Sequence, residues 1–222
     1  MNIVKQEAKL INVSDKNVLE TIEKAAKICY QSEPADTPTD FIKMLLRRKH
    51  LTPFEQVTAR VEIITDRGVT HELVRHRLAS FNQESTRYCN YGGKEMEFIL
   101  PVEFYDVYDE RQIHKNDCIY VKGVRELQES NINHNYCIWR DAMSRADTSY
   151  NRMLKMGSAP QLARAVLPNS LKTSLIVTAN LREWLHIFKM RCASDSHTQI
   201  RELMINLREQ FRSRIPVVFD EV

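Results

Sequence analysis

The chain has 222 residues, of which 43% are hydrophobic and 27% are charged, and its formal net charge at pH 7 is +3. This composition is typical of a soluble globular protein with a substantial core. The positive excess is too small to indicate a nucleic acid partner by itself. No apolar run reaches the length of a membrane span, and the N-terminus lacks the apolar stretch of a signal peptide. We therefore expect a soluble, cytoplasmic protein.

Cysteine and glycine usage narrow the kinds of site that the chain can form. The cysteines are widely spaced and form no CxxC or CxxH pair, which argues against a disulfide framework and a zinc site, so we expect no metal. The chain has only 5 glycines and lacks both GxGxxG and the P-loop motif GxxxxGK followed by Ser or Thr. Any nucleotide must therefore be held by side chains and helix ends.

The first third of the chain predicts two helices and a strand. Ser14 suits the N-cap of a helix that extends to about Gln31, with apolar residues at helical spacing. Thr37-Pro38 opens a second helix with proline at its first position, and the basic run at 47–49 ends it. Residues 50–55 predict a turn. Residues 57–64 alternate apolar and polar side chains, which predicts a strand with one buried face.

Turn and cap signals predict the remaining elements. We expect residues 66–68 to break the strand before a short helix over 69–75, and residues 80–93 to form a loop because they have no sustained apolar period. A short strand follows over 97–101, and residues 105–156 are helical in composition, with one or two breaks near 130–134. A short helix over 160–166 and a strand over 173–178 lead to a helix capped by Asn180 and Glu183, and a final helix covers about 198–213. No linker divides the chain, so we expect a single α+β domain over residues 1–222.

The most informative segment is residues 75–88, which read RHRLASFNQESTRY. Arginines, a histidine, hydroxyls and side-chain amides are concentrated in this short window. Such a mixture suits the recognition of a phosphate and a polar heterocycle. A solvated surface would not need it, because lysine and glutamate serve there equally well. The segment therefore indicates a nucleotide ligand.

The order RHRxxSxNxxSxRY also matches, position for position, the signature motif of flavin-dependent thymidylate synthases. Three further segments resemble this family in the right order: HLTPFE at 50–55, RAVLP at 164–168, and NLREWLH at 180–186 with Arg191 downstream. The four segments together cover most of the chain. On these segments the sequence is identified as a member of that family.

This resemblance implies reductive methylation of dUMP to dTMP. In the family, the carbon comes from 5,10-methylenetetrahydrofolate, the reducing equivalents come from NADPH through bound FAD, and tetrahydrofolate is released. The reduced flavin delivers the hydride to the pyrimidine. The family also implies a small, mostly antiparallel sheet flanked by several helices, and a homotetramer with sites shared between subunits.

The resemblance further implies which residues bind dUMP. Arg191 is the expected catalytic group, because a guanidinium stays charged and can stabilise a uracil ring deprotonated at N3 by two hydrogen bonds. Arg87 and Arg164 suit the phosphate, which carries roughly two negative charges near neutral pH, and Ser85 with the N–H groups of residues 85–87 supplements them. The full expected set is Glu72, Leu73, Val74, Arg75, Gln83, Glu84, Ser85, Thr86, Arg87, Arg164 and Arg191.

A second set is implied for FAD. A flat imidazole such as His50 can pack against the flavin or the folate pterin, and Thr52 can hydrogen-bond the cofactor's phosphates. His186, beside the apolar Trp184 and Leu185, would ordinarily be a core histidine, but the family match makes it a ligand. The full expected set is His50, Thr52, Arg75, His76, Arg77, Gln83, Asn180, Leu181, Arg182 and His186.

Three positions need an interpretation of their own. Glu72 stands where some members place glutamine, and an acid near a phosphate would repel it, so Glu72 should face the sugar, the base or an arginine. Cys29 occupies a place that serine holds in some relatives near the flavin. Cys89 directly follows the signature, but the family needs no protein nucleophile, so we expect no covalent role for it.

Two alternatives stay open from the residues alone. The first is flavin-dependent one-carbon transfer to another pyrimidine nucleotide such as dCMP, which the residues facing the base would decide. The second is a basic nucleic-acid-binding domain that uses the arginine-rich window with Tyr88 and Tyr91 as stacking residues. The second predicts colourless protein and a steep salt dependence of polynucleotide binding.

Overall fold

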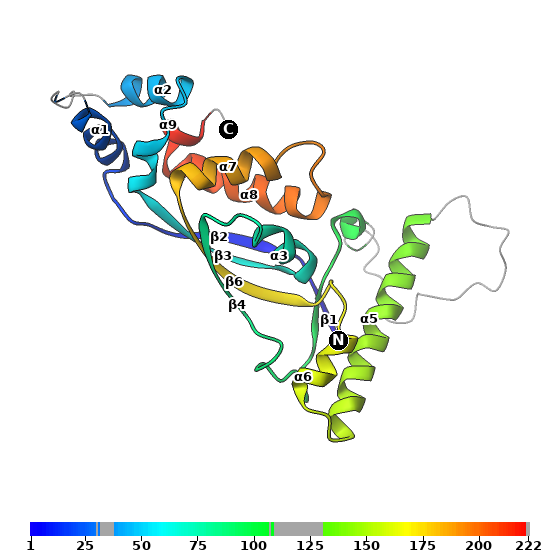
Figure 1. Cartoon of the computed structure of the whole chain (residues 1–222). Coiled ribbons are helices and arrows are strands. Elements are labelled where there is room, and N and C mark those ends of the chain that lie inside the picture. Colours follow the sequence, from blue (N-terminus) through cyan, green and yellow to red (C-terminus); the bar gives the residue numbers. More distant parts are fainter. Residues whose placement is uncertain (30, 32–37, 107, 109–130, 221–222) are drawn as a thin grey trace. The chain divides into compact units, whose positions relative to one another are not determined.

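The computed structural model describes residues 1–29, 31, 38–106, 108 and 131–220 (Figure 1). These residues form two compact units. Unit 1 comprises Met1–Gln6, Thr65–Gly68 and Glu84–Thr173, and unit 2 comprises Glu7–Ile64, Val69–Gln83 and Ser174–Val222. A single domain over residues 1–222 stays a prediction.

A sheet with the strand order β2-β3-β6-β4 organises unit 2. The strands are β2 (Glu7–Val13), β3 (Thr58–Asp66), β6 (Lys172–Asn180) and β4 (Ala79–Gln83). β2 pairs antiparallel with β3, and β4 pairs antiparallel with β6, where Phe81 lies opposite Val177. The strands predicted over 57–64 and 173–178 are confirmed. The loop predicted over 80–93 is wrong at its start, because Ala79–Gln83 is a strand whose polar residues hide its alternation.

The helices of unit 2 pack around a shared apolar core. They are α1 (Val18–Ile28), α2 (Thr39–Arg47), α7 (Leu181–Arg191), α8 (Thr198–Arg214) and α9 (Pro216–Phe219), with the 3-10 turn η1 (Thr52–Gln56). α8 packs on β2 and against α7 (Figure 1). In the cluster of Trp184, Phe188, Phe211 and Phe219, the centroids of neighbouring rings lie 5.0–5.8 Å apart. This aromatic cluster fixes the inner face of α7.

Three helix starts differ from the prediction. The N-cap of α1 is Asn17, and the Ser14 hydroxyl instead accepts a hydrogen bond from the Thr58 N–H at 3.0 Å, so it joins the neighbouring strand. α2 begins at Thr39, with Pro38 as its N-cap. α3 (Arg67–Leu73) begins directly after β3, so Asp66 still belongs to the strand and residues 67–68 already belong to the helix.

Unit 1 combines a short parallel strand pair with helices. β1 (Asn2–Val4) pairs with β5 (Glu97–Ile99), followed by η2 (Val102–Phe104), α5 (Asn131–Lys155), α6 (Pro160–Ala163) and η3 (Arg164–Val166). The short helix predicted over 160–166 is therefore confirmed as α6 and η3. Much of the predicted 105–156 helical region, with Cys118, lies outside the described residues. The break predicted near 130–134 is wrong from Asn131 onward, because α5 is continuous there.

The architecture confirms the predicted class, a mixed helix and sheet fold with a small, mostly antiparallel sheet flanked by helices. Among the described residues, no helix combines the length and the apolar composition needed to cross a membrane.

Candidate functional site

The helix α7 carries several of the candidate residues. At its start the Asn180 side chain caps it, accepting a hydrogen bond from the Glu183 N–H at 2.9 Å, as the sequence predicts. Trp184 and Phe188 are buried in the core, whereas Arg182 and His186 are exposed. One face of the helix therefore anchors it while the other presents polar side chains, and His186 is not a core histidine.

Arg191 ends α7 and is held by three hydrogen bonds within unit 2. Its Nε donates to Nε2 of His76 at 3.0 Å, its Nη1 donates to the Glu72 carboxylate at 3.0 Å, and its Nη2 donates to the Glu72 carbonyl at 3.1 Å. The side chain is 17% exposed. A guanidinium has about five N–H donors, so about two are left for a ligand. The Arg191 side chain is thus oriented by the protein while keeping capacity to bind.

Glu72 links Arg191 to α8. Its second carboxylate oxygen lies 2.8 Å from Nδ1 of His197, the N-cap residue of α8. The expectation that Glu72 faces the sugar, the base or an arginine is therefore met by Arg191. A carboxylate paired in this way offsets the positive charge of Arg191 and does not point unpaired at a phosphate.

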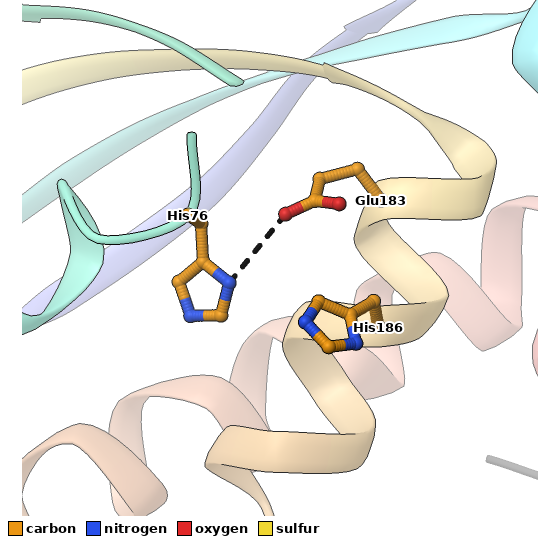
Figure 2. Close-up of side chains that lie close together, drawn as sticks. All are labelled: His76, Glu183 and His186. Atoms are coloured by element: carbon orange, nitrogen blue, oxygen red, sulfur yellow. Dashed lines mark ion pairs between the residues drawn. The ribbon is translucent and has the colours of Figure 1, made fainter. Parts of the chain in front are cut away.

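His76 is the second partner of Arg191 and is only 5% exposed. Its Nδ1 lies 3.5 Å from a carboxylate oxygen of Glu183 (Figure 2). The centroids of the His76 and His186 rings lie 5.7 Å apart, with the rings arranged edge to face. Burial, followed by the charges of Arg191 and His186, lowers the pKa of His76 to about 4. Burial raises the pKa of the Glu183 carboxyl, against the opposing effects of His186 and Arg182. The imidazole is therefore neutral at pH 7.

The hydrogen bond from Arg191 also defines the tautomer of His76. A guanidinium only donates, so Nε2 must accept and the ring proton must sit on Nδ1, facing Glu183. The ligand atoms of His76, Glu183 and His186 lie within 4.8 Å of one another, close enough for a metal ion. A metal on Nδ1 would move the proton to Nε2 and break the bond from Arg191. The hydrogen bonds observed here therefore favour a proton-bearing Nδ1 over a metal-bound one.

The residues expected to bind FAD all belong to unit 2. α2 ends with the His50 N–H donating to the Leu45 carbonyl at 2.9 Å and the Lys49 N–H donating to the Leu46 carbonyl at 3.0 Å, with Lys49 at φ +59°. This is a Schellman ending, which places His50 directly beyond the helix. His50 and the neighbouring Thr52 are exposed.

The other members of the FAD set differ in exposure. Arg75 and Arg77 are exposed beside the buried His76, and Arg182 is half-exposed and pairs with Glu55. Leu181 is fully buried, and its N–H donates to the Val57 carbonyl at 2.9 Å, so it supports the start of α7 from the core. The exposed cations can reach a ligand, whereas Leu181 contributes through the fold.

The expected dUMP residues fall in both units. In unit 2, Leu73 is buried in the core, Val74 and Arg75 are exposed, and the Gln83 amide donates to the Thr70 hydroxyl at 3.1 Å. Glu72 and Arg191 complete this group. The structure brings Glu72, His76 and Arg191 together within unit 2.

In unit 1, the expected phosphate residues surround a tight turn. Ser85 accepts hydrogen bonds from the Arg87 N–H through its hydroxyl at 3.3 Å and from the Cys89 N–H through its carbonyl at 2.8 Å. Arg164 donates to the buried Thr86 hydroxyl at 3.2 Å. Arg87 is exposed. The turn therefore carries the exposed Arg87 and contacts Arg164 through Thr86, although the Arg87 N–H is engaged within it.

A cavity of about 610 Å³ adjoins this turn in unit 1. Glu84, Tyr88, Tyr91 and Lys172 contribute to its lining. The Tyr91 hydroxyl donates to the Glu84 carboxylate at 2.7 Å, and burial followed by this contact raises the pKa of Tyr91. Glu84 thus contributes a hydrogen-bonding carboxylate to the lining of the cavity, and such a lining suits a polar ligand better than an apolar one.

Comparison with known proteins decides the family. Residues 9–217 match the sequence model of the family described as thymidylate synthase complementing protein. The flavin-dependent thymidylate synthase of Corynebacterium aurimucosum is 30% identical over 207 residues, which cover 90% of this chain and 78% of that protein. The chain belongs to the flavin-dependent thymidylate synthase family. The resemblance drawn from the four sequence segments is therefore confirmed.

Other relatives agree with this membership. The flavin-dependent thymidylate synthases of Corynebacterium diphtheriae and Geobacter sulfurreducens are 29% and 27% identical, covering 90% and 88% of this chain and 77% and 78% of those proteins. Among solved structures, the UMP/dUMP methylase PolB of Streptomyces cacaoi, bound with 5-Br dUMP, superposes with a TM-score of 0.77 at 24% identity. That match covers 99% of this chain and 96% of PolB and supports the fold.

Two residues near Arg191, Glu183 and His197, were not expected from the sequence to belong to the site of this family member. Glu183 was interpreted only as the capping-box partner of Asn180, but its side chain points toward His76 (Figure 2). Its spacing of three residues from His186 places both on one helix face, a signal that could have indicated a shared site. His197 gave no such signal.

Proposed function

We propose that this protein methylates dUMP to dTMP, using 5,10-methylenetetrahydrofolate as carbon donor and NADPH as reductant through bound FAD. The donor supplies a methylene carbon, NADPH supplies a hydride and solvent a proton, and the products are dTMP, tetrahydrofolate and NADP⁺. The enzyme class and the flavin follow from family membership. The substrate and the roles of the residues rest on the site.

The observation that carries the proposal is the orientation of Arg191. Hydrogen bonds from three of its nitrogens to Glu72 and His76 fix the guanidinium and leave about two N–H donors. Two donors on one planar cation suit the O–C–N edge of a uracil ring deprotonated at N3. Stabilising that anion raises electron density at C5, where the new carbon bond forms. Arg191 acts as an electrostatic catalyst in this scheme.

The phosphate of dUMP needs cations elsewhere. Arg87 and Arg164, on and beside the turn at residues 85–89 of unit 1, supply two guanidinium groups for a group with roughly two negative charges. The buried Thr86 hydroxyl accepts a hydrogen bond from Arg164 and helps to orient it. We assign the nucleotide phosphate to these two arginines.

Unit 2 has side chains that suit a flavin dinucleotide. Arg75 and Arg77 are exposed cations for its phosphates, and His50 and His186 are exposed flat rings. When bound, FAD would supply the hydride that reduces the transferred carbon at the pyrimidine. The protein's own residues would hold and orient it without a glycine-rich loop. We also propose a cytoplasmic homotetramer with shared sites, and light scattering of the purified protein tests the tetramer.

Tritium release from 5-tritiated dUMP tests the substrate. Purified protein with NADPH and 5,10-methylenetetrahydrofolate should release tritium to water and form dTMP. Comparison reactions use dCMP and UMP, the latter because PolB is named a UMP/dUMP methylase. Turnover of dCMP without turnover of dUMP would contradict the proposal.

Flavin absorbance tests the cofactor. Protein from a flavin-replete host should be yellow, and NADPH should bleach the flavin band. Colourless protein that neither binds added FAD nor oxidises NADPH would rule out the proposed chemistry.

A further inference from the structure

We propose that Glu183 is a positioning residue, whose buried side chain orients His76 so that His76 can hold the Arg191 guanidinium against the pyrimidine. This inference deepens the proposed function and rests on it for the role of Arg191. The contacts among Glu183, His76 and Arg191 are all within unit 2 and do not depend on any ligand.

The first step is the burial of Glu183. Glu183 is only 5% exposed, although it lies in the first turn of α7 and the preceding residue, Arg182, is half-exposed. A carboxylate withdrawn from water is unfavourable unless a partner compensates it. One of its oxygens lies 3.5 Å from Nδ1 of His76 (Figure 2). The carboxylate is therefore placed to act on His76.

The second step is the orientation of the imidazole. The Arg191 Nε–H requires an accepting Nε2, so Nδ1 of His76 carries the ring proton and needs an acceptor of its own. An oxygen of Glu183 faces that nitrogen. At 3.5 Å the contact is electrostatic rather than a close hydrogen bond, and it still favours this ring orientation over one turned by 180°. Glu183 thus selects the orientation in which Nε2 meets Arg191.

The third step leads to the substrate. Glu72 holds the far end of the guanidinium, and His76 holds Nε at its base. With only one of these supports, the plane of the guanidinium could rotate, and its remaining N–H donors would lose a fixed direction. Outer-shell partners of metal ligands change activity by roughly tenfold or more when they are lost, and we expect a loss of similar size here. Glu183 acts through His76 and needs no contact with substrate.

Two variants separate positioning from a merely structural role. Glu183→Gln keeps an accepting oxygen for His76, whereas Glu183→Leu has similar bulk and no acceptor. Glu183→Leu leaves the buried Nδ1–H of His76 without an acceptor, which should lower its unfolding free energy by roughly 1–3 kcal/mol and still leave the chain folded. Its kcat should nevertheless fall roughly tenfold, while Glu183→Gln should stay within about threefold of the wild type.

A matched control comes from a second buried glutamate in unit 2. Glu23 is 1% exposed and pairs with Lys27 on α1 at 3.0 Å. Glu23→Leu removes a buried carboxylate in the same unit without touching His76. We expect it to leave kcat unchanged.

A spectroscopic readout makes the test independent of activity. Nitrogen-15 NMR of the His76 ring should report a protonated Nδ1 and an accepting Nε2 in the wild type and in Glu183→Gln, and a mixture of ring states in Glu183→Leu. If Glu183→Leu keeps both the wild-type kcat and the wild-type ring state, the positioning role is wrong. If the wild type does not turn over dUMP at all, the proposed function fails, and the ring state still decides whether Glu183 orients His76.

Discussion

The Nε of Arg191 donates a hydrogen bond of 3.0 Å to Nε2 of His76, a residue 115 positions earlier in the chain. Only a neutral imidazole can accept it. The charge state of His76 is therefore tied to the orientation of the residue that we propose as the catalyst. This pairing makes the function of Arg191 and the titration of His76 testable together.

Substitution of Arg191 should remove catalysis and spare the cofactor. Arg191→Ala deletes the group proposed to stabilise the uracil anion, and loss of one such electrostatic contact lowers kcat about 10²–10³-fold. Flavin absorbance of the purified variant should match the wild type. Arg191→Lys keeps the charge but loses the planar fork, so it should recover little activity. Joint loss of flavin and activity would assign Arg191 to the cofactor instead.

The pH dependence of stability should carry the signature of His76. Its folded pKa of about 4 lies below the ordinary value of 6.5, so between these pH values the unfolded chain binds a proton that the folded chain excludes. The contribution of His76 to the free energy of unfolding is therefore fully present above about pH 6.5. It decreases by roughly 3 kcal/mol as pH falls toward 4.

The groups that face His76 also affect the free energy of unfolding in this pH range. Glu183 has a raised pKa, so its own contribution runs in the opposite direction, and Arg191 and His186 are the other facing groups. Urea unfolding of the wild type and of His76→Gln from pH 7 to 4 isolates the histidine. Equal pH slopes in the two proteins would contradict a neutral, buried His76, and NMR titration of the ring measures its pKa directly.

Asn180 should serve the fold and the cofactor through different atoms. Its Oδ1 caps α7, and we propose that its amide N–H₂ contacts FAD, since family resemblance places Asn180 among the FAD-contacting positions. Without cofactor, Asn180→Ala should lower the unfolding free energy by about 1 kcal/mol, whereas Asn180→Asp keeps the cap and should not. Both variants should bind FAD more weakly. Wild-type FAD affinity in Asn180→Asp would show that the amide does not hold the cofactor.

Lys49 should be replaceable by glycine with a gain in stability. It occupies the left-handed position of the Schellman ending of α2, at φ +59°, where a side chain is strained. Lys49→Gly should raise the unfolding free energy by up to about 1 kcal/mol. The matched control is Lys43→Gly at an exposed site inside the same helix, which should lower it by about 1 kcal/mol. Similar losses of unfolding free energy in both variants would argue against backbone strain at Lys49.

Local signals predicted the parts of the fold that local rules determine. The cap at Asn180, the strand over 173–178 and the final helix follow from short-range patterns and are confirmed. β2 was missed because an irregularity in its pairing between Leu10 and Asn12 interrupts the two-residue alternation. β4 was missed because Ser80, Asn82 and Gln83 make an edge strand resemble a polar loop.

The candidate site could be predicted only in part, because its side-chain contacts join residues that are distant in the sequence. Arg191, His76 and Glu72 were each expected from family motifs, but their mutual hydrogen bonds depend on tertiary folding. Glu183 shows the limit clearly, since a capping-box interpretation accounts for its position in sequence and says nothing of where its carboxylate points. Long-range pairing of this kind leaves no periodic trace in one sequence.

The helix α7 has one more consequence. It runs from the cap at Asn180 to Arg191, and a helix of this length spans roughly 16 Å at 1.5 Å per residue. Cofactor contacts are proposed at its first turns and the substrate contact at its end, while the Trp184–Phe188 face is fixed in the core. A small displacement of this one rigid element would shift both ligand contacts at once. Occupancy by one ligand is thereby expected to alter affinity for the other, a thermodynamic coupling that follows from shared anchorage.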